Sequence, residues 1–242
     1  MTETDLPTRF VLTASPIQAA ALLPALGRTM VGLSHGGATH ERIGVVQQVT
    51  EAEGALVISG EAHESRLALA PIARLVADRS GGMRGKIFPR IEFQDAAGTV
   101  LMSVIGMDGV EAFDSAMRDW VGETLAVPEK PTPATTSDEP VAAGAGGAAL
   151  EALRDSGGEV EIFLGVGPAR QSWQGRIEEV KPAMGFANII RPDFHLHLRD
   201  GSVSGFRETP EGWAALDEAG APTGLVLRPL DATARDALAL LG

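Results

Sequence analysis

Short runs of alternating apolar and polar residues recur along the whole chain, and this period of two is typical of half-buried β-strands. In the first half the runs cover residues 42–49, 55–60, 90–94 and 99–105. In the second half they cover residues 159–166, 174–180, 195–199, 202–206 and 224–230. Because glycine-containing turns join many of the runs, the pattern predicts an α+β fold dominated by antiparallel sheets.

A helical pattern closes each half of the chain. The segments "GVEAFDSAMRDWV" (109–121) and "DATARDALALLG" (231–242) carry apolar residues at helical spacing. Asp108 and Asp231 stand at the start of these segments, where a side chain that accepts backbone N–H groups stabilises the first turn. We therefore predict that each half ends in a helix capped by an aspartate.

The chain divides near its centre. Residues 127–147, "VPEKPTPATTSDEPVAAGAGG", are rich in Pro, Thr, Ala and Gly and contain almost no large apolar side chain. Such a segment buries too little surface to offset the entropy of ordering it, so it is predicted to be a linker. It separates a first part, residues 1–126, from a second part, residues 148–242.

The two parts resemble each other at a shift of about 131 residues, which indicates an internal repeat. At this shift residues 44–49 match residues 175–180, and residues 55–69 match residues 186–200. Further along the chain, residues 94–98 match residues 216–220. The last pair, "QDAAG" and "LDEAG", reads as the same turn between two strands. The predicted architecture is two tandem similar repeats, each a large antiparallel β-sheet with flanking helices.

Composition removes several classes of function. The chain has no cysteine, which excludes disulfides, iron–sulfur clusters and thiol nucleophiles. It also has no tyrosine, which excludes a phenolate ligand for iron. Its net charge of −12, without any strongly basic stretch, argues against general nucleic-acid binding. The N-terminus lacks the pattern of a signal peptide, and no apolar run is long enough to span a bilayer. We expect a cytoplasmic protein without membrane insertion.

The segment "RPDFHLHLRD" (191–200) places His195, His197 and Arg199 on one face of a strand. Two histidines supply only part of the three or four ligands that zinc requires. In the repeat alignment His197 corresponds to Arg66, which cannot bind a metal. From the sequence we therefore interpret this row as a polar face of a sheet and not as a metal site.

"GGATHERIG" (36–44) is the other stretch with candidate chemistry. His40 follows a Gly-Gly turn at the start of a strand, and Glu41 points to the opposite face. His40 is either ordinary polar surface or an exposed imidazole at the mouth of a cleft, available to an iron centre. No nucleotide-binding loop, serine-hydrolase elbow or zinc-protease helix is present, so no catalytic residue is predicted.

Several segments together resemble the bacterial haem-utilisation family of hemin-degrading factors and haem carriers, the HemS/ChuS and ChuX/HutX group. The segments are "LGRTMVGLSHGGATHERIG" (26–44), "ESRLAL" (64–69), "IEFQDAAG" (91–98), "AFDSAM" (112–117) and residues 161–203. The resemblance covers most of the chain outside the first 20 residues and the linker. It implies two β-rich halves that hold haem in a cleft between elements of both.

The resemblance also implies site residues. Arg66 matches the family's arginine on the distal side of haem, and His197 matches a frequent histidine of the second-half strand. His40 matches a histidine that contacts haem in some members, and Arg199 is placed to pair with a propionate. The candidate cofactor-binding residues are thus His40, Arg66, His197 and Arg199, with His40 as the candidate ligand of the haem iron.

The chain also departs from the family pattern. No histidine stands between His63 and His195, where two-repeat members carry the proximal ligand, and Glu208 replaces an expected lysine. We expect a cytoplasmic haem (hemin) binding and trafficking protein in haem and iron utilisation. Its partners are haem and either the cytoplasmic side of a haem importer or a haem oxygenase. The alternatives are a protein-interaction or regulatory module that keeps the fold without haem and, third, a haem-degrading oxygenase.

Overall fold

The computed structural model describes residues 6–83, 85–129 and 144–240. Contacts divide the chain into two units. The first comprises Met1–Gly32 and Arg42–Pro131, and the second comprises Leu33–Glu41 and Thr132–Gly242. Strands dominate both units and their described pairs are antiparallel, which confirms the predicted α+β class. None of the helices in the described ranges is long and apolar enough to cross a membrane.

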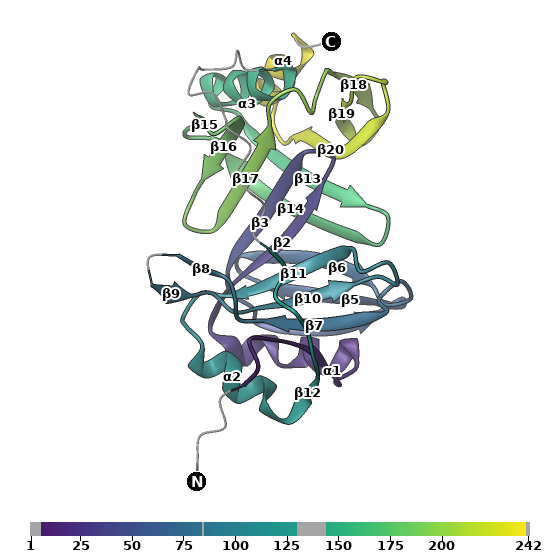
Figure 1. Cartoon of the computed structure of the whole chain (residues 1–242). Coiled ribbons are helices and arrows are strands. Elements are labelled where there is room, and N and C mark those ends of the chain that lie inside the picture. The colour runs from purple at the N-terminus through teal and green to yellow at the C-terminus, as the bar shows by residue number, and fades with distance from the viewer. Residues whose placement is uncertain (1–5, 84, 130–143, 241–242) are drawn as a thin grey trace. The chain divides into compact units, whose positions relative to one another are not determined.

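The first unit is built mainly from strands that lie side by side in the order β12-β1-β7-β10-β11-β2. Figure 1 labels β7, β10 and β11 next to one another in this order. Their bounds are β1 Arg9–Leu12, β2 Arg28–His35, β7 Arg74–Asp78, β10 Arg90–Gln94, β11 Val100–Gly106 and β12 Val121–Thr124. A meander follows β3 (Ala38–Val45) and consists of β4 Gln48–Ala52, β5 Ala55–Gly60 and β6 His63–Ala68. A small ribbon of β8 (Gly82–Met83) and β9 (Lys86–Ile87) completes the strands described in this unit.

Two helices, each with an adjoining 3₁₀ turn, supply further core side chains to the first unit. The helical segments are α1 Pro16–Ala21 with a turn at Leu23–Leu26, and α2 Glu111–Met117 with a turn at Arg118–Trp120. Ser15 is the N-cap of helix α1 and forms a capping box with Gln18, in which each side chain accepts the backbone N–H of the other residue. Phe113 and Met117 of α2 are buried, as are Phe10 and Phe93 of the strands. The core therefore forms where the apolar faces of strands and helices coincide.

The second unit contains a sheet in the order β18-β19-β20-β13-β14 and a meander of β15, β16 and β17. The strands are β13 Glu159–Val166, β14 Ala169–Arg176, β15 Lys181–Ala183, β16 Phe186–Ile190, β17 Phe194–Arg199, β18 Gly205–Thr209, β19 Gly212–Leu216 and β20 Pro222–Pro229. Helices α3 (Ala145–Ser156) and α4 (Ala232–Ala239) pack against each other (Figure 1). The tip of the β2–β3 hairpin, residues 33–41, also belongs to this unit.

The element order confirms the predicted tandem repeat. Strands β2, β3, β5, β6 and β7 begin at residues 28, 38, 55, 63 and 74, while β13, β14, β16, β17 and β18 begin at 159, 169, 186, 194 and 205. Every pair is thus separated by the expected 131 positions. The matched turns also agree, because Asp95 and Asp217 each accept backbone N–H groups two and four residues further on.

Some local predictions are wrong in detail. Asp231 caps α4 by accepting the Ala234 N–H, but Asp108 does not cap α2, whose N-cap is Val110. Asp108 instead accepts the backbone N–H of Arg28, because it stands two residues too early to reach the first turn. The run 42–49 is also not one strand, since β3 ends at Val45 and β4 begins at Gln48.

The predicted division into residues 1–126, 127–147 and 148–242 stays a prediction. Within the proposed linker, residues 130–143 lie outside the described residues. The last linker residues, from Ala145, form the start of α3, a helix that the apolar pattern did not indicate. Leu150 and Leu153 of this helix are buried, so packing within the unit holds it in place.

Candidate functional site

The predicted row on β17 is present in the structure. Phe194, Leu196 and Leu198 are buried, while His195 and His197 are partly exposed and Arg199 is exposed. The strand period therefore turns the apolar side chains into the core and the row of polar side chains to the other face. This row is the framework of the candidate site.

A third polar group joins the row from the β2–β3 hairpin. Glu41 of β3 lies with its Oε2 atom 3.3 Å from His195 Nδ1 and 3.6 Å from His197 Nε2. One potential ligand atom from each of the three residues lies within 4.8 Å of the others. The group Glu41, His195 and His197 is called the Glu–His–His cluster below.

The orientation of His197 is fixed by Asn188, its direct cross-strand neighbour on β16. The Asn188 Nδ2 atom donates to the backbone carbonyls of Lys181 and Phe186, so its Oδ1 atom is the one that faces His197. His197 Nδ1 lies 2.6 Å from that oxygen and must carry a proton to bond to it. In the neutral ring the Nε2 atom therefore presents a lone pair towards Glu41.

The carboxyl group of Glu41 is ionised at neutral pH. Burial alone raises its pKa, but hydrogen bonds and charge interactions with His195 and His197 outweigh burial and lower the pKa to about 2. The cluster thus combines one carboxylate with two imidazoles, a set of donors typical of sites for protons or transition-metal ions.

His40 lies on the other face of β3 from Glu41 and is fully buried. Its Nδ1 atom is 2.8 Å from Gln171 Oε1, and its Nε2 atom is 3.1 Å from the carbonyl oxygen of Ile162. Its ring also packs at 4.8 Å from the ring of Phe194. Both nitrogens are engaged in this conformation, so coordination of haem iron by His40 would require one of these contacts to break.

The two candidate arginines have different surroundings. Arg66 of β6 belongs to the first unit, where its guanidinium bonds to Glu53 at 2.9 Å and to the carbonyl of Ala52 at 3.1 Å. Arg199 of β17 belongs to the second unit, and its guanidinium lies 5.7 Å from the centre of the Phe186 ring. Because side chains alternate along a strand, Arg199 lies on the same face of β17 as His197.

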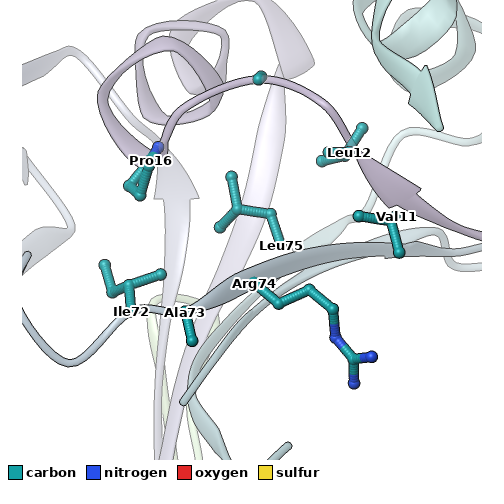
Figure 2. A pocket seen from close by; sticks show the side chains of 8 residues that line it. Val11, Leu12, Pro16, Ile72, Ala73, Arg74 and Leu75 are labelled. Carbon is teal, nitrogen blue, oxygen red and sulfur yellow. The ribbon is translucent and has the colours of Figure 1, made fainter. Parts of the chain in front are cut away.

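Two cavities in the described residues are small. One, of about 140 Å³, lies in the first unit beside Pro16, Ile72 and Leu75 (Figure 2). Figure 2 shows the side chain of Arg74 leaving the strand on the opposite side from Leu75. The other, also of about 140 Å³, lies in the second unit and includes Trp213 in its lining. Both are below the roughly 300–1,000 Å³ of pockets for drug-sized ligands.

Sequence reasoning found His195 and His197 but not Glu41 and Asn188 as their partners. The alternation on β3 did show that Glu41 points away from His40. The signal for Asn188 is the register of the hairpin between residues 186–190 and 194–199, which places Asn188 opposite His197. The position of Glu41 beside β17 depends on a contact between distant segments, which no local pattern indicates.

Comparison with known proteins gives a likeness of structure. The chain is similar to ChuS, described as an Escherichia coli haem oxygenase, with 19% identity, a TM-score of 0.74, and coverage of 97% of this chain and 89% of that one. It is also similar to holo-PhuS, described as a haem-binding protein from Pseudomonas aeruginosa, with 18% identity, a TM-score of 0.73, and coverage of 97% and 87%. No protein-family model and no curated protein sequence matches the chain.

At this level of identity the likeness establishes the fold. The chain is an α+β protein with the two-repeat fold shared by ChuS and PhuS, and the resemblance expected from the sequence is confirmed to that extent.

Proposed function

We propose that the chain is a haem-binding protein of the carrier type, acting in the cytoplasm in haem and iron utilisation. The observation that carries the proposal is the likeness to ChuS and PhuS over 97% of the chain, because the first is described as a haem oxygenase and the second as haem-binding. The proposed partners remain a haem importer at its cytoplasmic side or a haem oxygenase.

The residues of the second unit fit haem in their chemistry. Iron requires an imidazole nitrogen with a free lone pair, and His197 offers Nε2 while Asn188 holds its Nδ1–H. The side chain of His197 is 33% exposed, so a ligand from solvent can reach it. Arg199 follows on the same face and can form a charge-assisted pair with a propionate. Bound haem would supply the iron and its redox chemistry.

Of the residues predicted from the sequence, His197 and Arg199 are the better supported by geometry. His40 and Arg66 remain part of the proposal as second candidates, for iron and for a propionate respectively. Their present partners, Gln171 for His40 and Glu53 for Arg66, would have to be exchanged for haem.

A carrier suits the described site better than an oxygenase. Enzymes that oxidise a bound cofactor or substrate exclude water from it. The row on β17 is instead half-exposed, with His195 and His197 partly exposed and Arg199 exposed. An open strand face favours uptake and release, which is what transfer between an importer and an enzyme requires.

The test is a hemin titration of the full chain and of four variants, in which the Soret absorption band reports binding. We expect a 1:1 Soret shift at micromolar hemin in the parent. His197→Ala should abolish or strongly weaken it, and Arg199→Ala should weaken binding by about tenfold, the loss of one charge-assisted pair. His40→Ala tests the second iron candidate, and His35→Ala is the control, because His35 is an exposed histidine of the same unit.

Two outcomes would overturn this proposal. No Soret shift in the folded parent would favour the module that keeps the fold without haem. Conversion of the bound hemin to a biliverdin-like product with ascorbate would favour the oxygenase over the carrier.

A further inference from the structure

The Glu–His–His cluster has features that haem binding does not require. Haem iron takes one imidazole from a face of the protein, whereas here two imidazoles and a carboxylate converge on one point. His195 and His197 come from β17 and Glu41 from β3, and the Glu41 Oε2 atom lies within 3.6 Å of a ring nitrogen of each histidine. The side chains are 26%, 15% and 33% exposed, so the cluster is reached from solvent but partly shielded.

We propose that Glu41, His195 and His197 form a binding site for a divalent transition-metal ion, with Zn²⁺ as the ion that fits the donor set. Zinc is bound by imidazole nitrogen at about 2.0–2.1 Å and by carboxylate oxygen at about 2.0–2.2 Å. Two such ligands at a tetrahedral angle lie about 3.4 Å apart. The two separations in the structure, 3.3 and 3.6 Å, match this edge of a tetrahedron.

The remaining separation, between the two imidazoles, closes by side-chain rotation. The ligand atoms lie within 4.8 Å of one another, which exceeds the ideal edge by about 1.4 Å at most. His195 is the imidazole that can turn, since its ring lies 6.0 Å from that of His197 at an angle of 78° and is partly exposed. His197 itself is held in place by Asn188.

Asn188 gives the cluster the outer contact that metal-binding histidines generally have. Such a histidine donates its second ring N–H to an oxygen, which fixes the tautomer and raises the basicity of the ligating nitrogen. His197 makes this contact with Asn188 Oδ1 at 2.6 Å, and backbone carbonyls fix the Asn188 amide in turn. Asn188 is therefore a positioning residue.

The same geometry leaves Nε2 of His197 to the cluster. Its Nδ1 atom lies 2.6 Å from Asn188 Oδ1, and its Nε2 atom lies 3.6 Å from Glu41 Oε2. That distance is longer than an ordinary hydrogen bond, which runs to about 3.2 Å, and close to the edge of a tetrahedral zinc site, so a metal ion between the two atoms would use both donors. Three protein ligands leave a fourth position for water or a further ligand.

This inference goes beyond haem binding and does not rest on it. The test uses the full chain without a histidine tag, stripped with chelator and free of haem. Co²⁺ replaces Zn²⁺ as a spectroscopic probe, and equilibrium dialysis measures zinc itself. We expect one ion per chain, visible d–d absorption for a tetrahedral cobalt site, and displacement of the cobalt by zinc.

The variants separate ligands from other residues. Glu41→Gln keeps the size of the side chain but loses the charge, and His195→Ala removes one nitrogen; each should weaken zinc binding at least 100-fold. Asn188→Ala should weaken it by about 10–100-fold, the typical effect of removing an outer hydrogen bond. His35→Ala, on the same hairpin but outside the cluster, should leave binding unchanged.

The outcomes are decisive in both directions. Stoichiometric binding that is lost in Glu41→Gln and kept in His35→Ala supports the site, provided the circular-dichroism melting curve shows that the variant is folded. Binding weaker than millimolar in the parent, or equal losses in both variants, overturns it. Glu41→Gln also separates this proposal from haem binding, because that variant should retain the hemin Soret shift.

Discussion

At the residue scale, His40 shows that a side chain expected from the sequence to be exposed can be buried in the fold. The resemblance to haem proteins makes His40 a candidate iron ligand, and its place after two glycines is consistent with an exposed position. In the structure the ring is fully buried between Gln171 and the carbonyl of Ile162. Gln171 is also the residue that matches His40 in the second repeat, so equivalent positions of the two repeats meet at this point.

We expect His40→Ala to act on stability. The substitution removes a buried ring that packs on Phe194 and takes a hydrogen-bond partner from Gln171, so the free energy of unfolding should fall by about 2–4 kcal/mol. Urea denaturation measures this, with exposed His35→Ala expected within about 0.5 kcal/mol of the parent. An unchanged stability together with a lost Soret shift would instead identify His40 as the iron ligand.

His63 of the first unit should make stability depend on pH. Its side chain is buried, and burial lowers its pKa below the usual value; the Gly44 backbone opposes this effect, and the charge of Arg42 adds to it. The unfolded chain, with a histidine pKa near 6.5, therefore binds the proton more readily than the folded chain. The stabilising contribution is complete above about pH 6.5 and is lost as the pH falls from there through the lower pKa of the folded state.

The measurement is urea denaturation of the parent and of His63→Leu between pH 7.5 and 5. The difference in unfolding free energy between the two proteins should change with pH below about 6.5, by at most about 1.4 kcal/mol per pH unit, and should be flat above it. A difference that does not change over this range would show that His63 takes up its proton equally in the folded and unfolded chain.

At the scale of elements, strands β1, β7 and β10 share a buried network of charges. Arg9 bonds to Asp78 and, at 2.8 Å, to Glu92. Arg90 donates a hydrogen bond to Asp78 at 3.0 Å and forms an ion pair with Glu92, with its Nε atom 3.0 Å from Glu92 Oε1. Asp78 is fully buried, and Gln94 adds a hydrogen bond to Glu92 at 2.7 Å. Each strand supplies its charged residues on one face, so the network aligns the three strands in a single register.

Removing one partner of this network should cost far more than removing a surface pair. Arg9→Ala leaves buried carboxylates with fewer compensating charges, and about 3–5 kcal/mol of unfolding free energy should be lost. The matched control is Arg66→Ala in the same unit, where the partner Glu53 has an 84% exposed side chain, and the loss should be about 1 kcal/mol or less. Thermal denaturation of both variants measures the two losses of unfolding free energy. Similar losses in Arg9→Ala and Arg66→Ala would contradict the stabilising role of the network.

The sequence predicted elements best where a single strand is bounded by turns. Residues 55–60 are β5 as expected, and residues 195–199 lie in β17, because alternation over a short run determines which face is buried. The prediction was wrong where two strands follow each other with little interruption, as at β3 and β4. It missed α3, whose Gly- and Ala-rich start resembles a linker by composition and is ordered by packing around Leu150 and Leu153.

At the scale of the whole molecule, the candidate site could be predicted only in part. The strand period gave the row of His195, His197 and Arg199, and the repeat gave its counterpart at Arg66. Glu41 lies 154 positions before His195 in the sequence and reaches it only because the hairpin tip 33–41 is packed into the second unit. Contacts of this kind depend on packing between distant segments, which neither periodicity nor motif spacing describes.

This division of the chain leads to a prediction about fragments. If residues 148–242 form an independent repeat, a fragment of residues 144–242 should fold alone. We expect it to be much less stable than the full chain, because Phe194, which is buried, packs on His40, and the backbone of Arg199 bonds to Gly37, both from the hairpin tip. Joining residues 28–45 to residues 144–242 through a flexible glycine–serine linker should restore much of the stability. Urea denaturation with far-ultraviolet circular dichroism compares the two, and cooperative unfolding at the same midpoint in both would show that the hairpin is dispensable to this unit.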